Sequence, residues 1–356
     1  MIIFSPGPSN ISERVRRALL HPDIGHRDTE FTALLGSVRT RLLTVAGLKP
    51  GAAYSSVILG GSGSAAIESV VAAARPAGTV LVIANGPYGE RAAAMAAYHG
   101  VTVDLWSLPW GEAIPLDLLE ARLAASRPGA VYCVHHETAT GRLNPLAAVA
   151  ARAKAVGAFM LADTVSSIAG EDLDIEGWQL DAVIGSSNKC LRGVPGAAFV
   201  IASRAFLDLA KAQRGAHYSN LAEHTAAEDR GETPFTPPVH SLFALSEALD
   251  ETLDEGVAVR CAHYAALADQ TLTALESLGL PLLLPRDAYG HTLVSAELPT
   301  GWSYTALHAA LKRDGFSIYA AQGALKERAF RLGLIGHFGE AEVAALFVAM
   351  RRVLGR

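Results

Sequence analysis

A lysine and an aspartate each follow a short apolar segment, and together they could carry out chemistry on amines and carbonyls. Lys189 comes after the apolar run 181–185 and the small polar residues at 186–188. Asp163 ends the apolar run 159–162 in the same way. Each run is typical of a buried strand, and ligands of α/β folds bind beyond the carboxyl ends of such strands. Partial burial there would lower the pKa of the lysine and leave an amine suited to imine formation.

A lysine and a carboxylate that face one cleft are the two groups that pyridoxal phosphate requires. The lysine amine forms a Schiff base with the cofactor, and the carboxylate keeps the pyridine nitrogen protonated so that the ring can accept electrons. Lys189 and Asp163 would meet in this way at the edge of a parallel sheet. A lone lysine in a turn is usually a solvated surface residue, so the aspartate is what favours the catalytic interpretation.

A glycine-rich turn, Gly60-Gly61-Ser62-Gly63-Ser64, stands between a predicted strand and a predicted helix. Glycines let the backbone approach an anion, and a helix N-terminus offers unpaired N–H groups and a partial positive charge. No Gly-Lys-Ser/Thr follows, so the turn is not a Walker A motif. A dinucleotide fingerprint is met by Gly61, Gly63 and Ala66, but the next strand ends without an acidic residue for a ribose. The sequence predicts a phosphate cradle, with dinucleotide binding or a purely structural turn as alternatives.

Two more polar side chains follow predicted strands. Tyr88, in NGPYGERA, stands where an aromatic ring could stack on a flat cofactor, although a loop tyrosine needs no such role. Thr138, in VHHETATGRLNP, could hydrogen-bond a cofactor hydroxyl. The adjacent His135 and His136 would point to opposite faces of a strand. No third ligand is near in the sequence, so we predict no metal site.

Composition restricts the class of protein. The chain has 356 residues, of which 50% are hydrophobic and 18% charged, enough for one large domain and one smaller domain. Its formal net charge of −5 gives no indication of a nucleic-acid partner. Three widely spaced cysteines predict neither a disulfide framework nor a metal site. With no signal peptide at the start and no apolar run of about 18 residues, we expect a soluble cytoplasmic protein without a membrane partner.

Alternating strand-like and helical segments predict an α/β fold, with a mostly parallel sheet covered by helices on both faces. Residues 196–201 follow Lys189 too closely for a helical crossover, so an antiparallel strand is expected there. A long polar loop is predicted over 213–236, followed by a long helix from about Pro238. The expected organisation is an N-terminal arm (1–15), a large domain (16–250) and a smaller C-terminal α+β domain (251–356).

These segments resemble the class V, fold-type I pyridoxal-phosphate aminotransferases over essentially the whole chain. Within that family, HHETATGRLNP and SSNKCLRGVPGAAFVIA are most similar to the enzymes that move an amino group from 2-aminoethylphosphonate to pyruvate, and FTPPVHSLFAL and FRLGLIG fit the same branch. The segments 8–10 and 25–28 are more similar to the alanine–glyoxylate and serine–pyruvate branch, which is the alternative. The resemblance implies a seven-stranded sheet in the large domain, an amino donor with a 2-oxo acid acceptor, and a homodimer with shared active sites.

The resemblance also implies a role for each matched residue in binding the cofactor. Lys189 becomes the Schiff-base lysine and Asp163 the partner of the pyridine nitrogen. The other cofactor contacts that it implies are Ser62, Gly63 and Ser64 at the phosphate, Thr236 at the phosphate from the neighbouring subunit, Tyr88 on the ring and Thr138 at the ring oxygen.

Recognition of the substrate is implied to depend on arginine. Arg331, in FRLG, matches the residue that grips the acid group of the substrate, for which a bidentate guanidinium is suited. A doubly charged phosphonate would need a further cation or several N–H and hydroxyl donors. Arg27 is the first candidate for that cation, and Arg192 is the second. Either arginine could instead pair with a surface carboxylate.

Overall fold

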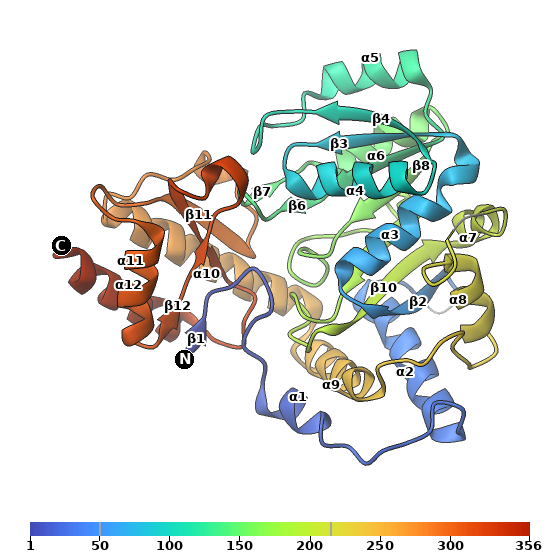
Figure 1. The fold of residues 1–356 in the computed structure, drawn as a ribbon, viewed down its shortest axis with the longest axis horizontal. Coiled ribbons are helices and arrows are strands. Elements are labelled where there is room, and N and C mark those ends of the chain that lie inside the picture. The colour runs from blue at the N-terminus through green and yellow to red at the C-terminus, as the bar shows by residue number, and fades with distance from the viewer. Residues whose placement is uncertain (50, 214–215) are drawn as a thin grey trace.

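The computed structural model describes residues 1–49, 51–213 and 216–356, which form a large domain and a smaller C-terminal domain (Figure 1). The large domain is built on a seven-stranded sheet. Its strands, in spatial order, are β2 (Tyr54–Gly61), β10 (Gly196–Ser203), β9 (Ala182–Ser186), β8 (Phe159–Asp163), β5 (Ala130–Val134), β3 (Thr79–Ala84) and β4 (Thr102–Ser107). Only β10 runs antiparallel to its neighbours, β2 and β9. The predicted, mostly parallel sheet and its antiparallel strand after Lys189 are confirmed.

Helices cover both faces of this sheet because successive strand residues point in opposite directions. In β5, for example, Val131 and Cys133 belong to one buried cluster, and Ala130, Tyr132 and Val134 belong to the other. The first cluster packs against α2 (Thr29–Val45), α5 (Leu116–Ser126), α6 (Leu146–Ala155) and α9 (Val239–Glu255). The second packs against α3 (Gly63–Ala73), α4 (Pro87–Tyr98), α7 (Arg204–Ala210) and α8 (Leu221–Glu228).

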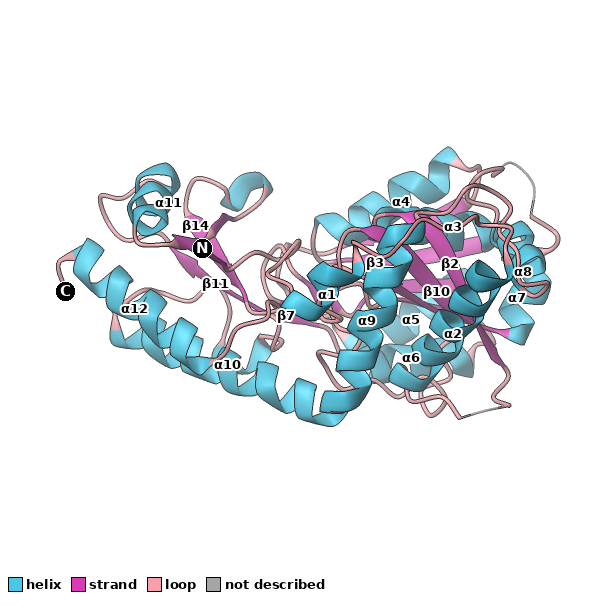
Figure 2. Cartoon of the chain, turned by 90° about the horizontal axis from the view of Figure 1, so that it is seen from below, coloured by secondary structure: helices cyan, strands magenta, loops and turns pink. Residues whose placement is uncertain are grey.

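The small domain has a three-stranded sheet with its own apolar core. Its strands are β11 (Leu293–Glu297), β14 (Ala329–Gly333) and β13 (Tyr319–Ala320), and its helices are α10 (Val257–Ser277), α11 (Tyr304–Arg313) and α12 (Glu340–Leu354). The start of the chain also joins this domain, because β1 (Ile2–Ile3) pairs in parallel with β12 (Phe316–Ser317). Figure 2 shows α10 as the long helix that leads from the large domain into the small one.

Smaller elements connect these layers. Helix α1 (Glu13–Ala18) begins after Ser12, whose Oγ caps it by accepting a hydrogen bond from Val15 N at 3.1 Å. The short strands β6 (His136–Glu137) and β7 (Arg142–Leu143) pair with each other. Short 3₁₀ turns occupy 75–77, 286–288 and 323–325. Among the described helices, none has both the length and the apolar character that crossing a bilayer requires.

Two local predictions differ from the structure. The long loop predicted over 213–236, of which 214–215 lie outside the described residues, is interrupted by α8, whose first turn is capped by Asn220 and whose Leu221 and Ala227 are buried. The long helix predicted from Pro238 is two helices, because Gly256 between α9 and α10 adopts φ +85°. A glycine tolerates that left-handed conformation, which ends one helix and redirects the chain into the next.

Candidate functional site

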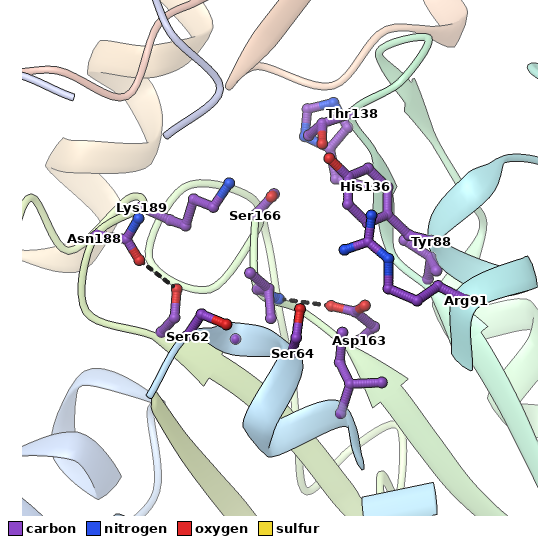
Figure 3. A pocket seen from close by; sticks show the side chains of 15 residues that line it. Ser62, Ser64, Tyr88, Arg91, His136, Thr138, Asp163, Ser166, Asn188 and Lys189 are labelled. Atoms are coloured by element: carbon purple, nitrogen blue, oxygen red, sulfur yellow. Dashed lines mark hydrogen bonds between the residues drawn. The ribbon is translucent and has the colours of Figure 1, made fainter. Parts of the chain in front are cut away.

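A cavity of about 210 Å³ opens at the carboxyl ends of β8 and β9, beside the first turns of α3 and α4 (Figure 3). Seven of the residues predicted to bind a cofactor line it together, although they come from five separate segments of the chain. They are Ser62, Gly63, Ser64, Tyr88, Thr138, Asp163 and Lys189. In Figure 3, Tyr88 and Thr138 lie on one wall, Lys189 on the opposite wall, and Ser62, Ser64 and Asp163 at the floor.

Lys189 lies in the turn after β9, as the sequence predicts, and its amine reaches back to the N-terminal arm. It donates a hydrogen bond to the carbonyl oxygen of Pro6. Burial lowers the pKa of this amine, and the positive charge of Arg331 lowers it further, against the opposing effects of Tyr88 and Asp163. The lysine therefore holds its proton less firmly than a solvated lysine does.

Asp163 is the last residue of β8 and is buried, with 4% of its surface exposed. Its Oδ1 accepts from Val165 N at 3.0 Å and its Oδ2 from Tyr132 Oη at 2.9 Å. Burial nevertheless raises the pKa of this carboxyl, while these two donors and the charges of Lys189 and Arg91 act in the opposite direction. A cationic N–H group in the cavity would hold Asp163 in its ionised form.

The first turn of α3 is arranged to receive an anion. Ser62 is the N-cap residue of this helix, and its side chain makes no capping hydrogen bond there. A side chain at Gly63 would crowd the site, because its Cβ would lie 3.0 Å from both methyl carbons of Val165. Bare N–H groups and free hydroxyls at a helix N-terminus are the ordinary means of holding a phosphate.

Glu137 is a buried carboxyl that sequence reasoning missed, and it joins β6 to the first turn of α4 in the wall that carries Tyr88 and Thr138. Its Oε1 accepts from Ala139 N at 2.9 Å, and its Oε2 accepts from Tyr88 N, in the first turn of α4, at 3.4 Å. Burial raises the pKa of Glu137 to about 8, although both backbone donors oppose that rise. A Cβ on Gly86 would collide with this carboxyl. The glycine thus leaves room for the acidic side chain beneath Tyr88.

Arg331 lies in β14 beside this wall of the cavity and is buried. Its Nη1 donates to Thr138 O at 2.9 Å, and its Nε donates to Ala320 O at 2.9 Å. Burial lowers the pKa of Arg331, and the neighbouring Tyr88 and Glu137 oppose that change. Two carbonyls thus fix the plane of a guanidinium that the small domain brings to a site of the large domain.

Further lining residues were not predicted as contacts, namely Arg91, His136, Ser166 and Asn188. Arg91 follows Tyr88 by one helical turn of α4, and its guanidinium lies 5.1 Å from the centroid of the Tyr88 ring. That spacing places both residues on one face of a helix, a signal present in NGPYGERA. His136 was considered only as a metal ligand, whereas the structure places it in the cavity wall.

Three predicted residues lie apart from this cavity within one chain. Thr236 is exposed and lines a separate small hollow with Gly60. Arg27 is exposed, and its Nη1 lies 3.9 Å from Glu232 Oε2. Arg192 is buried and turned toward α10, where its Nε donates to Tyr264 Oη at 2.9 Å. A role for any of them at the cofactor or substrate stays a prediction.

Comparison with known proteins identifies the family. The family model "Aminotransferase class-V" matches residues 16–322. The 2-aminoethylphosphonate–pyruvate transaminases of Vibrio vulnificus (strain YJ016) and Syntrophobacter fumaroxidans are each 33% identical to the chain, covering 99% and 100% of it and 97% and 96% of their own lengths. An alanine–glyoxylate aminotransferase from Nostoc sp. superimposes with a TM-score of 0.92 at 29% identity, over 99% of this chain and 95% of that one. The chain belongs to the class V aminotransferases, fold-type I enzymes that depend on pyridoxal phosphate and transfer amino groups.

Proposed function

We propose that this enzyme moves the amino group of 2-aminoethylphosphonate to pyruvate, which yields phosphonoacetaldehyde and L-alanine. The observation that supports this choice of substrates is similarity along the full chain to relatives named for that reaction, at 33% identity. The cavity supports the reaction class, because it combines a half-buried lysine, a buried aspartate and an anion cradle.

The residues of the cavity fit pyridoxal phosphate. When bound, the cofactor supplies an aldehyde that takes up the amino group and a ring that accepts electrons. Ser62, Gly63 and Ser64 would hold its phosphate at the N-terminus of α3. Asp163 would pair with the pyridine N–H, a cationic partner that offsets the cost of burying an ionised carboxylate. Thr138 would bond the ring oxygen.

Lys189 would act first as the covalent anchor and then as the base. A lysine whose pKa burial has lowered is neutral in a larger fraction of molecules near neutral pH. Its free amine can then take the proton from the substrate carbon that bears nitrogen and return a proton to the carbon of the acceptor. Tyr88 would lie against the ring and keep the reacting carbon within reach of the amine.

Arg331 would bind the acid group of either substrate. Because Thr138 O and Ala320 O fix its guanidinium, the remaining N–H groups point in set directions. A phosphonate and the carboxylate of pyruvate can both accept such paired donors. We further propose that Arg27 supplies the additional cation that a phosphonate needs.

The enzyme is proposed to work as a homodimer in the cytoplasm. Thr236 is exposed, remote in sequence from Ser62–Ser64 and absent from the lining of the cavity in its own chain, which suits a contact to the phosphate made across subunits. Arg27 is also exposed and could contribute in the same way. Sedimentation of dilute active protein as a monomer would contradict this arrangement.

The substrate is tested by single half-reactions of the loaded enzyme. The protein, incubated with pyridoxal phosphate, should show a visible absorption band that borohydride removes. Mixing with 2-aminoethylphosphonate should bleach this band faster than L-alanine or L-serine does. The Arg27→Ala variant should slow the reaction with the aminophosphonate more than the reaction with alanine.

The likeness to the Nostoc alanine–glyoxylate enzyme supports a second candidate function. Rapid reaction of alanine or serine with glyoxylate, and none of the aminophosphonate, would establish that candidate instead.

A further inference from the structure

A short segment of the small domain, 290–292, is packed against the back of the cavity wall. Gly290 N donates to Gly141 O at 2.9 Å. Thr292 Oγ1 lies 2.7 Å from His136 Nδ1 and donates to Ser166 O at 2.9 Å. Because His136 and Ser166 both line the cavity, this segment of the small domain contacts the site from behind.

Glu171 is a buried carboxylate of the large domain at the centre of this contact. Its Oε1 accepts from His291 N, and its Oε2 lies 2.8 Å from His291 Nδ1. The same carboxylate is 3.6 Å from His136 Nδ1, while His136 Nε2 is 3.1 Å from Gly141 O. A Cβ at Gly290 would lie 2.8 Å from both Glu171 Oε1 and His136 Cε1. The two domains therefore meet here without room for any side chain at that position.

The contact leads directly to the arginine proposed to bind substrate. Residues 290–292 run into β11, in which Ser295 lies opposite Arg331 of β14. Ser295 Oγ also donates to Thr140 O of the large domain. A shift of the segment 290–292 would therefore be carried through β11 to the guanidinium of Arg331.

We propose that Glu171 is a positioning residue that holds His291 of the small domain and His136 of the cavity wall, and thereby sets where Arg331 lies over the cavity. This inference rests on the proposed role of Arg331 in binding the acid group. Neither histidine has to touch the substrate for the effect. The contact works by fixing one domain against the other.

Protonation of His291 gives this contact a dependence on pH. The close contact of its Nδ1 with Glu171 Oε2, at 2.8 Å, raises the pKa of His291 above the ordinary 6.5 against the effect of burial, and the charges of Glu171 and Asp172 act in the same direction. Burial lowers the pKa of His136, against the opposing effects of the Glu171 charge and the hydrogen bond to the Gly141 backbone. For Glu171, burial acts upward, yet the hydrogen bond and charges of the two histidines leave its pKa below 4.5. Asp269, Arg286 and Asp287 line the surface hollow beside His291.

The direction of the pH dependence follows from the raised pKa of His291. A histidine with a raised pKa contributes its full stabilisation below about 6.5, and the contribution is lost as the pH rises through the value in the folded protein. The ion pair of His291 with Glu171 should accordingly be complete near pH 6 and absent at high pH. The KM for the acid substrate should rise over that interval, because Arg331 is then held less firmly.

The test is Glu171→Gln, which keeps the shape of the side chain and removes its charge. In the wild type, we expect KM to rise about three- to tenfold from pH 6 to pH 9, as charge-assisted hydrogen bonds of a partly exposed group suggest. The variant should show the raised KM already at pH 6 and no further rise, with kcat within about twofold of the wild type at each pH. A variant with the KM and pH profile of the wild type would overturn the proposal.

Two additional measurements separate this inference from the proposed function. Glu68→Gln is the matched control, because Glu68 forms a similar glutamate–histidine pair, 2.7 Å from His99 Nε2, away from the contact between the two domains. The KM of this variant should follow that of the wild type at each pH. In the cofactor-free protein, amide exchange over 290–298 should be faster in Glu171→Gln than in the wild type or in Glu68→Gln. Unchanged exchange would contradict the proposed contact of Glu171 with the segment 290–292. Should Arg331→Lys leave KM unaltered, the role of Arg331 fails, while faster exchange would still establish the contact itself.

Discussion

The amine of Lys189 donates a hydrogen bond to the carbonyl oxygen of Pro6, a residue 183 positions earlier in the chain. The N-terminal arm thus closes over the lysine of the cavity, and β1 anchors the start of the arm in the small domain. One segment thereby joins the small domain to the reactive amine of the large domain.

Gly7→Ala should disturb this contact. A Cβ at Gly7 would lie 2.8 Å from Lys189 Nζ, and the φ of +127° disfavours any other residue. Gly157→Ala is the control, because Gly157 also has a positive φ but has nothing near its Cβ position. Gly157→Ala should lose about 1 kcal/mol of stability, and Gly7→Ala should lose more because its methyl group also meets the Lys189 side chain. Only Gly7→Ala should change the rate at which an amine-reactive reagent labels Lys189 in the cofactor-free protein. Equal labelling in both variants would contradict the arrangement.

Gly63→Ala should weaken the binding of pyridoxal phosphate at the N-terminus of α3. The new methyl group would press on both methyl carbons of Val165 at 3.0 Å and narrow the cradle. We expect the dissociation constant to rise by about tenfold, since overpacking typically costs about 1–3 kcal/mol. Gly36→Ala, in open space on α2, should leave the affinity unchanged. Titration of the cofactor-free proteins by absorbance measures both, and equal affinities would argue against an anion cradle at this turn.

Much of the site can be predicted from sequence because its central residues follow strands. The runs that end at Asp163 and precede Lys189 show their strand character locally, so their shared sheet edge follows from the fold class. Contacts between distant segments carry no such local signal. Neither the closure of Pro6 over Lys189 nor the contact of Glu171 with His291 could be derived from spacing.

The errors in the fold have local causes as well. Helix α8 lies in a polar stretch, and its buried face includes His224, Thr225 and Glu228 in addition to two apolar residues, which weakens the hydrophobic period that predicts a helix. Glu137 was missed because a buried acid looks like any other polar residue until its partners are known. The break at Gly256 could have been recognised, since glycine often follows the last residue of a helix.

Tyr264→Phe should slow turnover by loosening the turn that carries Lys189. Tyr264 Oη donates to Cys190 O at 3.1 Å and accepts from Arg192 Nε at 2.9 Å, and Arg260 Nη1 also donates to Cys190 O at 3.2 Å. The variant leaves a buried guanidinium N–H without its partner, at a cost of about 1–3 kcal/mol. We expect a lower kcat with little change in KM. Tyr54→Phe, which loses one bond to Ile175 O at the end of β2 opposite the glycine-rich turn, should keep the wild-type kcat; equal kcat values in both variants would refute this role.

Glu137→Gln should flatten the dependence of stability on pH. Burial raises the pKa of Glu137 to about 8, so the folded protein binds this proton more tightly than the unfolded chain, where the ordinary value is 4.5. Stability must therefore fall as the pH rises from 4.5 to about 8, because over this interval the unfolded carboxyl is ionised and folding has to take up a proton. Gln keeps the neutral shape of the protonated acid, so the variant should match the wild type below about pH 4.5, where the unfolded carboxyl is protonated as well, and exceed it in urea denaturation at pH 9. Glu228, whose pKa burial also raises to about 8, contributes to the same slope, so Glu137→Gln combined with Glu228→Gln should flatten it further. If the stability of the wild type instead rose between pH 6 and pH 9 and that of the single variant rose in parallel, a neutral Glu137 beneath Tyr88 would be excluded.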